Sequence, residues 1–212
     1  VERYSPGDAA KMVFAGRKTS VDRPLYKVDG AEGYSHFGFN WRALRERVAM
    51  LAGLDLSAIE ATFRHVRLTP GARMLVATMR AHGAYTALVS GGFTVFTARV
   101  AALCGFDEHH ANVLLDDGIR LTGAVAEPIL DRDAKLTALR RMAGGAGLAE
   151  AACLAVGDGA NDLAMLRAAG LGVAYRAKPV VTREIANRVE HADLRALLFA
   201  QGYPAASFSG RT

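Results

Sequence analysis

Two carboxylates and an amide follow closely on one apolar run of the sequence. The run Ala151–Val156 has the length and composition of a buried strand, and Asp158, Asn161 and Asp162 come directly after it in the text GDGAND. Glycines around Asp158 permit a sharp turn, and open α/β sheets bind ligands beyond the carboxyl ends of their strands. Because Mg²⁺ prefers oxygen ligands, the pattern predicts a magnesium site. The alternative is an ordinary strand-to-helix turn with a capping Asp.

Groups that suit a phosphorylated ligand stand at two further places. Ser90 and Gly91 follow the apolar run Ala84–Val89 and precede a helix, and a helix N-terminus favours phosphate. Lys135 is predicted in the first turn of a helix, where the dipole disfavours a cation, so a phosphate or a carboxylate is expected beside it. A capping serine and a solvated lysine are the alternatives.

Two arginines could recognise the rest of such a ligand. Arg45 and Arg47 flank Glu46 in an amphipathic helix that is predicted from Trp41 to Leu51. Either guanidinium could hold a carboxylate through two hydrogen bonds. The alternative is a charged outer face of the helix.

Strands and helices alternate along the chain from Leu68 onward. Strands are predicted at 84–89, 151–156 and 171–175, a hairpin at 111–115 with 120–125, and helices at 68–80, 93–104, 133–143, 163–169, 180–188 and 196–199. This alternation predicts a doubly wound α/β domain with a parallel sheet. We divide the chain into an atypical segment 1–38, a helical cap 39–66 with short helices at 41–51 and 55–64, and an α/β core 67–205 with the hairpin at about 111–126.

The composition narrows the possible partners and the compartment. The 212 residues are 51% hydrophobic and 22% charged, with a formal net charge of +5. The basic residues are scattered, which argues against a nucleic-acid partner, and no apolar run reaches the roughly 18 residues of a membrane span. Cys104 and Cys153 lie in apolar surroundings and are expected to be buried free thiols. A reducing, cytoplasmic location is therefore expected.

Residues 1–38 follow neither helical nor strand periodicity for long. Glycines and prolines recur, and the segment is predicted to be rich in loops. Its best strand candidates are the short runs Lys11–Ala15 and Leu25–Val28.

The motifs form an ordered set: Ser90 with two glycines, then Lys135, then GDGAND. The set resembles the second, third and fourth motifs of the haloacid dehalogenase superfamily of phosphatases, and most closely the branch that acts on O-phospho-L-serine. The resemblance runs from about Trp41 to Val189.

The resemblance implies a reaction and a role for each residue. In such enzymes an aspartate on the first strand attacks phosphorus, and water hydrolyses the aspartyl-phosphate. The implied function is Mg²⁺-dependent hydrolysis of O-phospho-L-serine to L-serine and phosphate in serine biosynthesis, with no nucleic-acid or membrane partner. The implied catalytic residues are Lys135, Ser90 and Asp162; the implied substrate-binding residues are Arg47, Ser90, Gly91, Lys135 and Asn161; and the implied magnesium ligand is Asp158.

The chain departs from the family at the first motif, which is Asp-x-Asp. Before Trp41 the only aspartates are Asp8, Asp22 and Asp29, and none has a second Asp two residues on. Without a nucleophilic aspartate the covalent route is closed, so we expect little or no turnover. The alternative functions are an inactive relative that binds phosphate or Mg²⁺, and a phosphatase for another small phosphomonoester.

Three hypotheses can account for residues 1–38. The first is that they result from a shifted reading frame or a misassigned start. The second is that they form a divergent segment that still supplies the first strand. The third is that a second chain supplies that strand. The position of these residues relative to the strands at 85–89 and 153–156 distinguishes the hypotheses.

Overall fold

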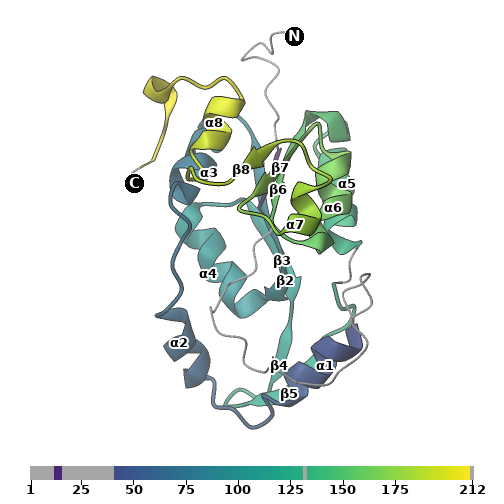
Figure 1. Ribbon diagram of the computed structural model, residues 1–212. Helices are drawn as coiled ribbons and strands as arrows, with labels where there is room; N and C mark the ends of the chain where they lie inside the picture. Colours follow the sequence, from purple (N-terminus) through teal and green to yellow (C-terminus); the bar gives the residue numbers. More distant parts are fainter. Residues whose placement is uncertain (1–11, 16–40, 131–132, 211–212) are drawn as a thin grey trace.

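The computed structural model of the chain describes residues 12–15, 41–130 and 133–210. Within them, a parallel six-stranded sheet runs in the order β3-β2-β1-β6-β7-β8, and β4 and β5 form a separate antiparallel pair (Figure 1). The strands are β1 Met12–Ala15, β2 Tyr85–Phe93, β3 Glu108–Asn112, β4 Leu114–Asp116, β5 Leu121–Val125, β6 Cys153–Gly157, β7 Leu171–Tyr175 and β8 Arg188–Val189. The α-helices are α1 Trp41–Ala49, α2 Ser57–Phe63, α3 Ala72–Ala81, α4 Thr94–Cys104, α5 Ala134–Gly145, α6 Leu163–Ala168, α7 Pro179–Thr182 and α8 Ala196–Ala200. The predicted doubly wound α/β fold is confirmed.

Helices cover both faces of the sheet because its central strands are apolar on both sides. Cys153 and Ala155 of β6 face a cluster that includes residues of α5 and α6. Leu154 and Val156, which alternate with them, face a second cluster with residues of α3 and α8. Successive side chains of a strand point to opposite faces, so one uninterrupted apolar run supplies both cores.

The centre of the sheet is occupied by β1, from the N-terminal segment. Met12 is the parallel partner of Tyr85 in β2 on one side and of Cys153 in β6 on the other. The chain thus supplies its own central strand at the first of the two predicted runs, and the hypothesis that a second chain replaces this strand is wrong. The other predicted run, Leu25–Val28, and the rest of segment 1–38 lie outside the described residues.

The hairpin differs from its prediction. Residues 108–112 form β3, which pairs in parallel with β2 in the main sheet, and the hairpin begins only at Leu114. The predicted hairpin strand 111–115 therefore joins parts of two strands, because an apolar run does not show which partner each residue pairs with. The predicted turn is confirmed: Gly118 has a φ of 91°, a conformation that suits glycine.

Two helices differ from their predicted bounds by four residues or more. The helix expected over 68–80 begins at Ala72, after Gly71 with a φ of 83°. The helix expected over 180–188 ends at Thr182, because Arg188 and Val189 form β8 and pair with β7.

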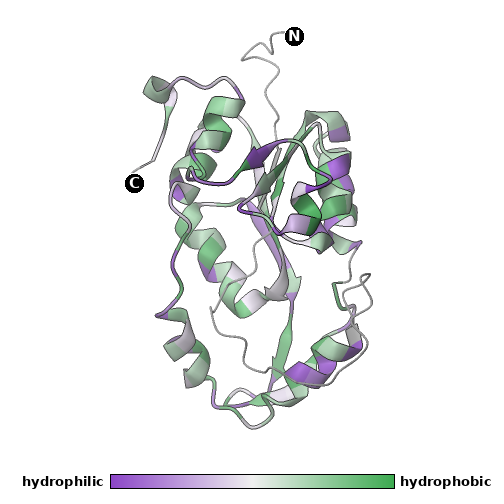
Figure 2. Ribbon diagram, viewed as in Figure 1, coloured by the Kyte–Doolittle hydropathy of each residue, from purple (hydrophilic) through white to green (hydrophobic). Residues whose placement is uncertain are grey.

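The cap helices pack against the hairpin rather than against the main sheet. Val48 of α1 and Ile59 of α2 share a buried apolar group with Leu114, Leu121 and Val125 of the hairpin, which we call the cap cluster. Figure 1 shows α1, α2, β4 and β5 together at one end of the molecule, and Figure 2 shows hydrophilic residues along α1. The division into 1–38, 39–66 and 67–205 stays a prediction.

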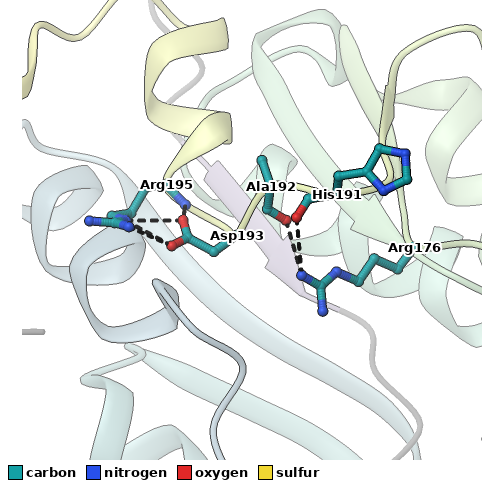
Figure 3. A network of polar contacts seen from close by, with 5 residues as sticks. All are labelled: Arg176, His191, Ala192, Asp193 and Arg195. Carbon is teal, nitrogen blue, oxygen red and sulfur yellow. Dashed lines mark hydrogen bonds and ion pairs between the residues drawn. The ribbon is translucent and has the colours of Figure 1, made fainter.

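A polar network holds the segment between β8 and α8 (Figure 3). Arg176 follows β7 with a φ of 44° and donates to the carbonyls of His191 and Ala192, each at 3.4 Å. The Arg195 guanidinium pairs with Asp193 and holds the pKa of that carboxyl below its usual range. These contacts fix the chain where it leaves the sheet.

Among the described residues, none of the helices has the length and apolar character of a bilayer span.

Candidate active site

Ser90 and Gly91 lie at the carboxyl end of β2, where the pairing with β3 is irregular between Val89 and Phe93. Ser90 is buried, and its Oγ accepts a hydrogen bond from the Gly92 amide at 3.0 Å. A Cβ on Gly92 would lie 3.2 Å from that Oγ, so the second glycine permits the tight turn of the chain. The two predicted residues therefore belong to an irregular strand end, and α4 begins three residues after Gly91, at Thr94.

Lys135 forms a buried ion pair in the first turn of α5. Its Nζ contacts Asp162 Oδ1, and the two residues are 6% and 0% exposed. The helix dipole disfavours the Lys135 cation in this turn, and the anion that compensates for it is the Asp162 carboxylate. The pKa of Cys153, at the start of the adjacent strand β6, is raised by burial and by Glu150 to about 11, so this thiol is protonated at neutral pH.

Asp162 also organises the turn after β6. Its Oδ2 accepts hydrogen bonds from the amides of Asp158 at 3.0 Å and Gly159 at 2.9 Å. A Cβ on Gly157 would come within 2.4 Å of the Asp162 side chain, so glycine is required for this fold-back. Asp162 therefore positions the turn and Lys135 together.

Asn112 joins two walls of the site and was not predicted from the sequence. It is 1% exposed, its Nδ2 donates to the Gly91 carbonyl at 3.1 Å, and its Oδ1 accepts from the Leu130 amide at 2.8 Å. A single Asn at a strand end carries no spacing signal. Only the three-dimensional structure shows that it connects β2 to the segment before α5.

Most of the predicted site residues converge on one small pocket. The pocket is lined by Val89, Ser90, Gly91, Leu130, Ala134, Lys135 and Asn161. Asp162 lies behind Lys135, and Asp158 is half-buried beside the pocket without lining it. Arg47 is exposed on α1 and is not among the lining residues. The structure thus brings together Ser90, Gly91, Lys135 and Asn161 and leaves Asp158 and Arg47 outside the lining.

The loop after β7 supports the turn that contains Asp158. The amide of Lys178 donates to the Asp158 carbonyl at 3.0 Å. This contact links the start of α7 to the end of β6 and fixes the position of the Asp158 backbone.

The described residues do not by themselves fit a magnesium ion. Across residues 12–15, 41–130 and 133–210, no three His, Cys, Asp or Glu residues gather closely enough to hold a metal. Both oxygens of Asp162 are engaged by Lys135 and by two amides. Asp158 is then the one other carboxylate in the turn after β6, and Mg²⁺ requires near-octahedral oxygen coordination.

A comparison with protein families decides the relationship. The model for the haloacid dehalogenase-like hydrolases matches residues 4–167. The chain belongs to this family. The match includes β1, so the family pattern reaches into the segment that the motifs alone did not cover.

Two relatives of the chain are named phosphoserine phosphatases. A phosphoserine phosphatase of Streptomyces coelicolor is 47% identical over 162 residues, which are 76% of this chain and 39% of the relative. A phosphoserine phosphatase of Lactococcus lactis subsp. lactis is 33% identical over 183 residues, with 86% of this chain and 84% of the relative covered. The chain therefore spans well under half of one relative and most of the other.

Solved structures agree with the family assignment. A phospho-aspartyl intermediate analogue of phosphoserine phosphatase superposes with a TM-score of 0.71 at 33% identity, covering 75% of this chain and 76% of that one. A probable phosphoserine phosphatase from Vibrio cholerae gives a TM-score of 0.75 at 32% identity, covering 80% of this chain and 53% of that one.

Proposed function

We propose that the pocket binds O-phospho-L-serine and that the chain is a phosphoric monoester hydrolase of the phosphoserine phosphatase type, acting in serine biosynthesis. The convergence of Ser90, Gly91, Lys135 and Asn161 on one pocket carries the proposal. Hydroxyl, backbone and ammonium groups, which this lining supplies, are kinds of group that hold phosphoryl oxygens. The names of the relatives point to the same substrate.

Each residue has a proposed role in this site. Ser90 and Gly91 contact phosphoryl oxygens, Lys135 neutralises negative charge on the phosphate, and Asn161 closes the opposite wall. Asp162 keeps Lys135 in place. Because Ser90, Gly91 and Lys135 are held by contacts within the protein before the ligand arrives, binding costs these groups little reorganisation.

Arg47 is the proposed contact for the substrate carboxylate. Within the described residues Arg47 is exposed and has no ion pair, whereas Arg45, two residues earlier, pairs with Glu127. A guanidinium without an ion pair among the described residues can donate to a substrate carboxylate without losing a partner.

The Arg47→Ala variant tests the substrate class. We expect weaker binding of phosphoserine and unchanged binding of inorganic phosphate, measured by calorimetry. Arg45→Ala is the matched control, because it removes a neighbouring guanidinium that already has a partner. Equal losses for both ligands in Arg47→Ala would assign this arginine a structural role.

A second function, binding without hydrolysis, is favoured by one observation. The central strand β1 ends at Ala15, and the sequence that follows to Trp41 contains no Asp-x-Asp. The covalent route of the family needs a carboxylate nucleophile, so this second function predicts binding of phosphoserine with little or no turnover.

Phosphate release and calorimetry on the same pure sample separate the two functions. Binding together with rapid release of phosphate from phosphoserine supports the hydrolase. Binding with no release supports the second function, and the absence of binding contradicts both.

Magnesium and the compartment are further proposals. Mg²⁺ is a general cofactor of this family, and Asp158 is the carboxylate of this chain that we propose as its contact. The test is a calorimetric Mg²⁺ titration of the wild type against Asp158→Asn. We place the protein in the cytoplasm, because Cys104 and Cys153 are buried and, among the described residues, form no disulfide, which suits a reducing compartment.

A further inference from the structure

One ion pair connects a cap helix directly to a core helix. Arg99 of α4 donates from Nη1 to Glu60 Oε2 of α2 at 2.8 Å, and from Nη2 to Glu60 Oε1. The two parallel hydrogen bonds match the fork of the guanidinium to the carboxylate, which is the geometry with the most directional preference among ion pairs. The two residues are 39 positions apart in the sequence, so the contact exists only when α2 rests on α4.

An aromatic ring completes the contact. Phe63 lies one helical turn after Glu60, and the Arg99 guanidinium carbon is 4.9 Å from the centre of its ring. The hydrogen bond from Arg99 lowers the pKa of Glu60, so the carboxylate is charged at neutral pH. Arg99 is thus held by a carboxylate and a ring on the same helix, and a lysine could not reproduce both contacts.

In the sequence, Arg99 follows shortly after the pocket residues Ser90 and Gly91. Phe93, Val95 and Phe96 pack against the cap cluster, and they follow Ser90 and Gly91 of the pocket. Arg99 comes one helical turn after Phe96, so one stretch of α4 meets the cap with apolar side chains and then with a charge. Ile59 of α2 belongs to the same apolar group, so α2 contacts α4 both through this group and through Arg99.

We propose that Glu60, Phe63 and Arg99 form a cap–core latch that sets how often α2 separates from α4. The side chains of Arg99 and Glu60 are 38% and 54% exposed. Exposed ion pairs are weak and screened by salt, so this latch opens readily, unlike a buried pair. Any effect of the latch on the binding of phosphoserine rests on the proposed function, in which the cap supplies Arg47 and the core supplies the phosphate site.

Hydrogen exchange of the ligand-free protein tests the latch. The Glu60→Gln and Arg99→Lys variants should speed exchange of the amides in α2 by about two- to fivefold, the range expected for one exposed ion pair. Amides of β6 in the core should exchange at the wild-type rate. Glu150→Gln is the matched control, because it breaks an exposed pair with Arg140 at 2.7 Å that does not involve the cap.

Two outcomes of this experiment would overturn the latch. One is unchanged exchange in α2 in both variants. The other is faster exchange in β6 as much as in α2, which would mean general loss of stability. Rising ionic strength should speed α2 exchange in the wild type and not in Glu60→Gln, because only the wild type has a charge pair to screen.

A reversed pair gives a second, independent test. The double variant Glu60→Arg with Arg99→Glu restores opposite charges across the same gap, so it should return α2 exchange toward the wild-type rate. Failure of this rescue with normal β6 exchange would contradict a role for the charge pair. Because none of these measurements uses a substrate, the latch can fail while the proposed function holds, and the reverse is also true.

Discussion

The buried pair of Lys135 and Asp162 is the residue-level feature on which the site most depends. Two charged side chains that are almost fully removed from water are stable there only because they pair with each other. Removal of one partner leaves the other as an uncompensated buried charge, which costs far more than the pair contributes.

Asp162→Asn should therefore reduce the free energy of unfolding by about 3 kcal/mol. The amide side chain can still accept from the amides of Asp158 and Gly159, so the loss isolates the missing charge. Urea denaturation measures the change, and Asp158→Asn, at a half-buried position in the same turn, is the control with a small expected effect. Equal stability of the two variants would contradict the importance of the buried pair.

Asn112 gives a second prediction at the residue scale. Asn112→Ala leaves the Gly91 carbonyl and the Leu130 amide without their partner, at a cost of about 2 kcal/mol in unfolding free energy. We also expect weaker binding of inorganic phosphate, because the two walls of the pocket lose their link.

The control for Asn112 is another asparagine with a backbone contact. Asn187 is exposed and donates to the Gly172 carbonyl at 3.2 Å, far along the sheet from the pocket strand β2. Asn187→Ala should change neither phosphate binding nor stability by a comparable amount. Weakened phosphate binding in both variants would show that the effect is not local to the pocket.

At the scale of elements, the connection from α6 to β7 depends on two glycines. A Cβ on Gly170 would lie 1.9 Å from the Ala151 carbonyl oxygen, and a Cβ on Gly172 would lie 1.9 Å from that of Leu166. Both obstacles are backbone atoms, which cannot rotate away as a side chain can. The close approach of β7 to α6 therefore requires glycine at 172, and the close approach of the connection to Ala151 requires glycine at 170.

Gly172→Ala should reduce the unfolding free energy by roughly 3 kcal/mol, at the upper end of what overpacking costs. Gly144→Ala is the matched control: it lies in α5 with nothing within 4 Å of the added methyl, so alanine should stabilise the helix by up to about 1 kcal/mol. Thermal unfolding of the two variants should shift in opposite directions. A shift in the same direction would mean that backbone crowding does not limit this connection.

The sequence predicts elements better than it predicts their partners. The apolar run at Cys153–Gly157 and the glycines after it are enough to locate β6 and its turn, because both signals are local. The assignment of residues 108–112 to the main sheet depends on β2, more than fifteen residues away, and no periodicity encodes it. The same reason explains why Asn112 was missed while Ser90 was predicted.

At the scale of the whole molecule, the fold depends on a strand of four residues. β1 pairs with β2 through Val13 and Thr86, and with β6 through Val13 and Leu154. Its partners are remote in sequence, so the sheet closes only after long loops have been ordered, which slows folding. Two strands of the main sheet, β3 and β2, lie on one side of β1, and three strands, β6, β7 and β8, lie on the other.

Val13→Pro tests this dependence. Proline removes a backbone donor from a strand with neighbours on both sides and is found in sheets almost only at edges. We expect loss of the cooperative unfolding transition, followed by circular dichroism, while Val13→Thr keeps a β-branched residue and should unfold cooperatively. If the proline variant retained a wild-type transition, then β2 and β6 would hold together without β1. The central place of the N-terminal segment in the fold would then be wrong, although the pocket between β2, α5 and the turn after β6 could still form.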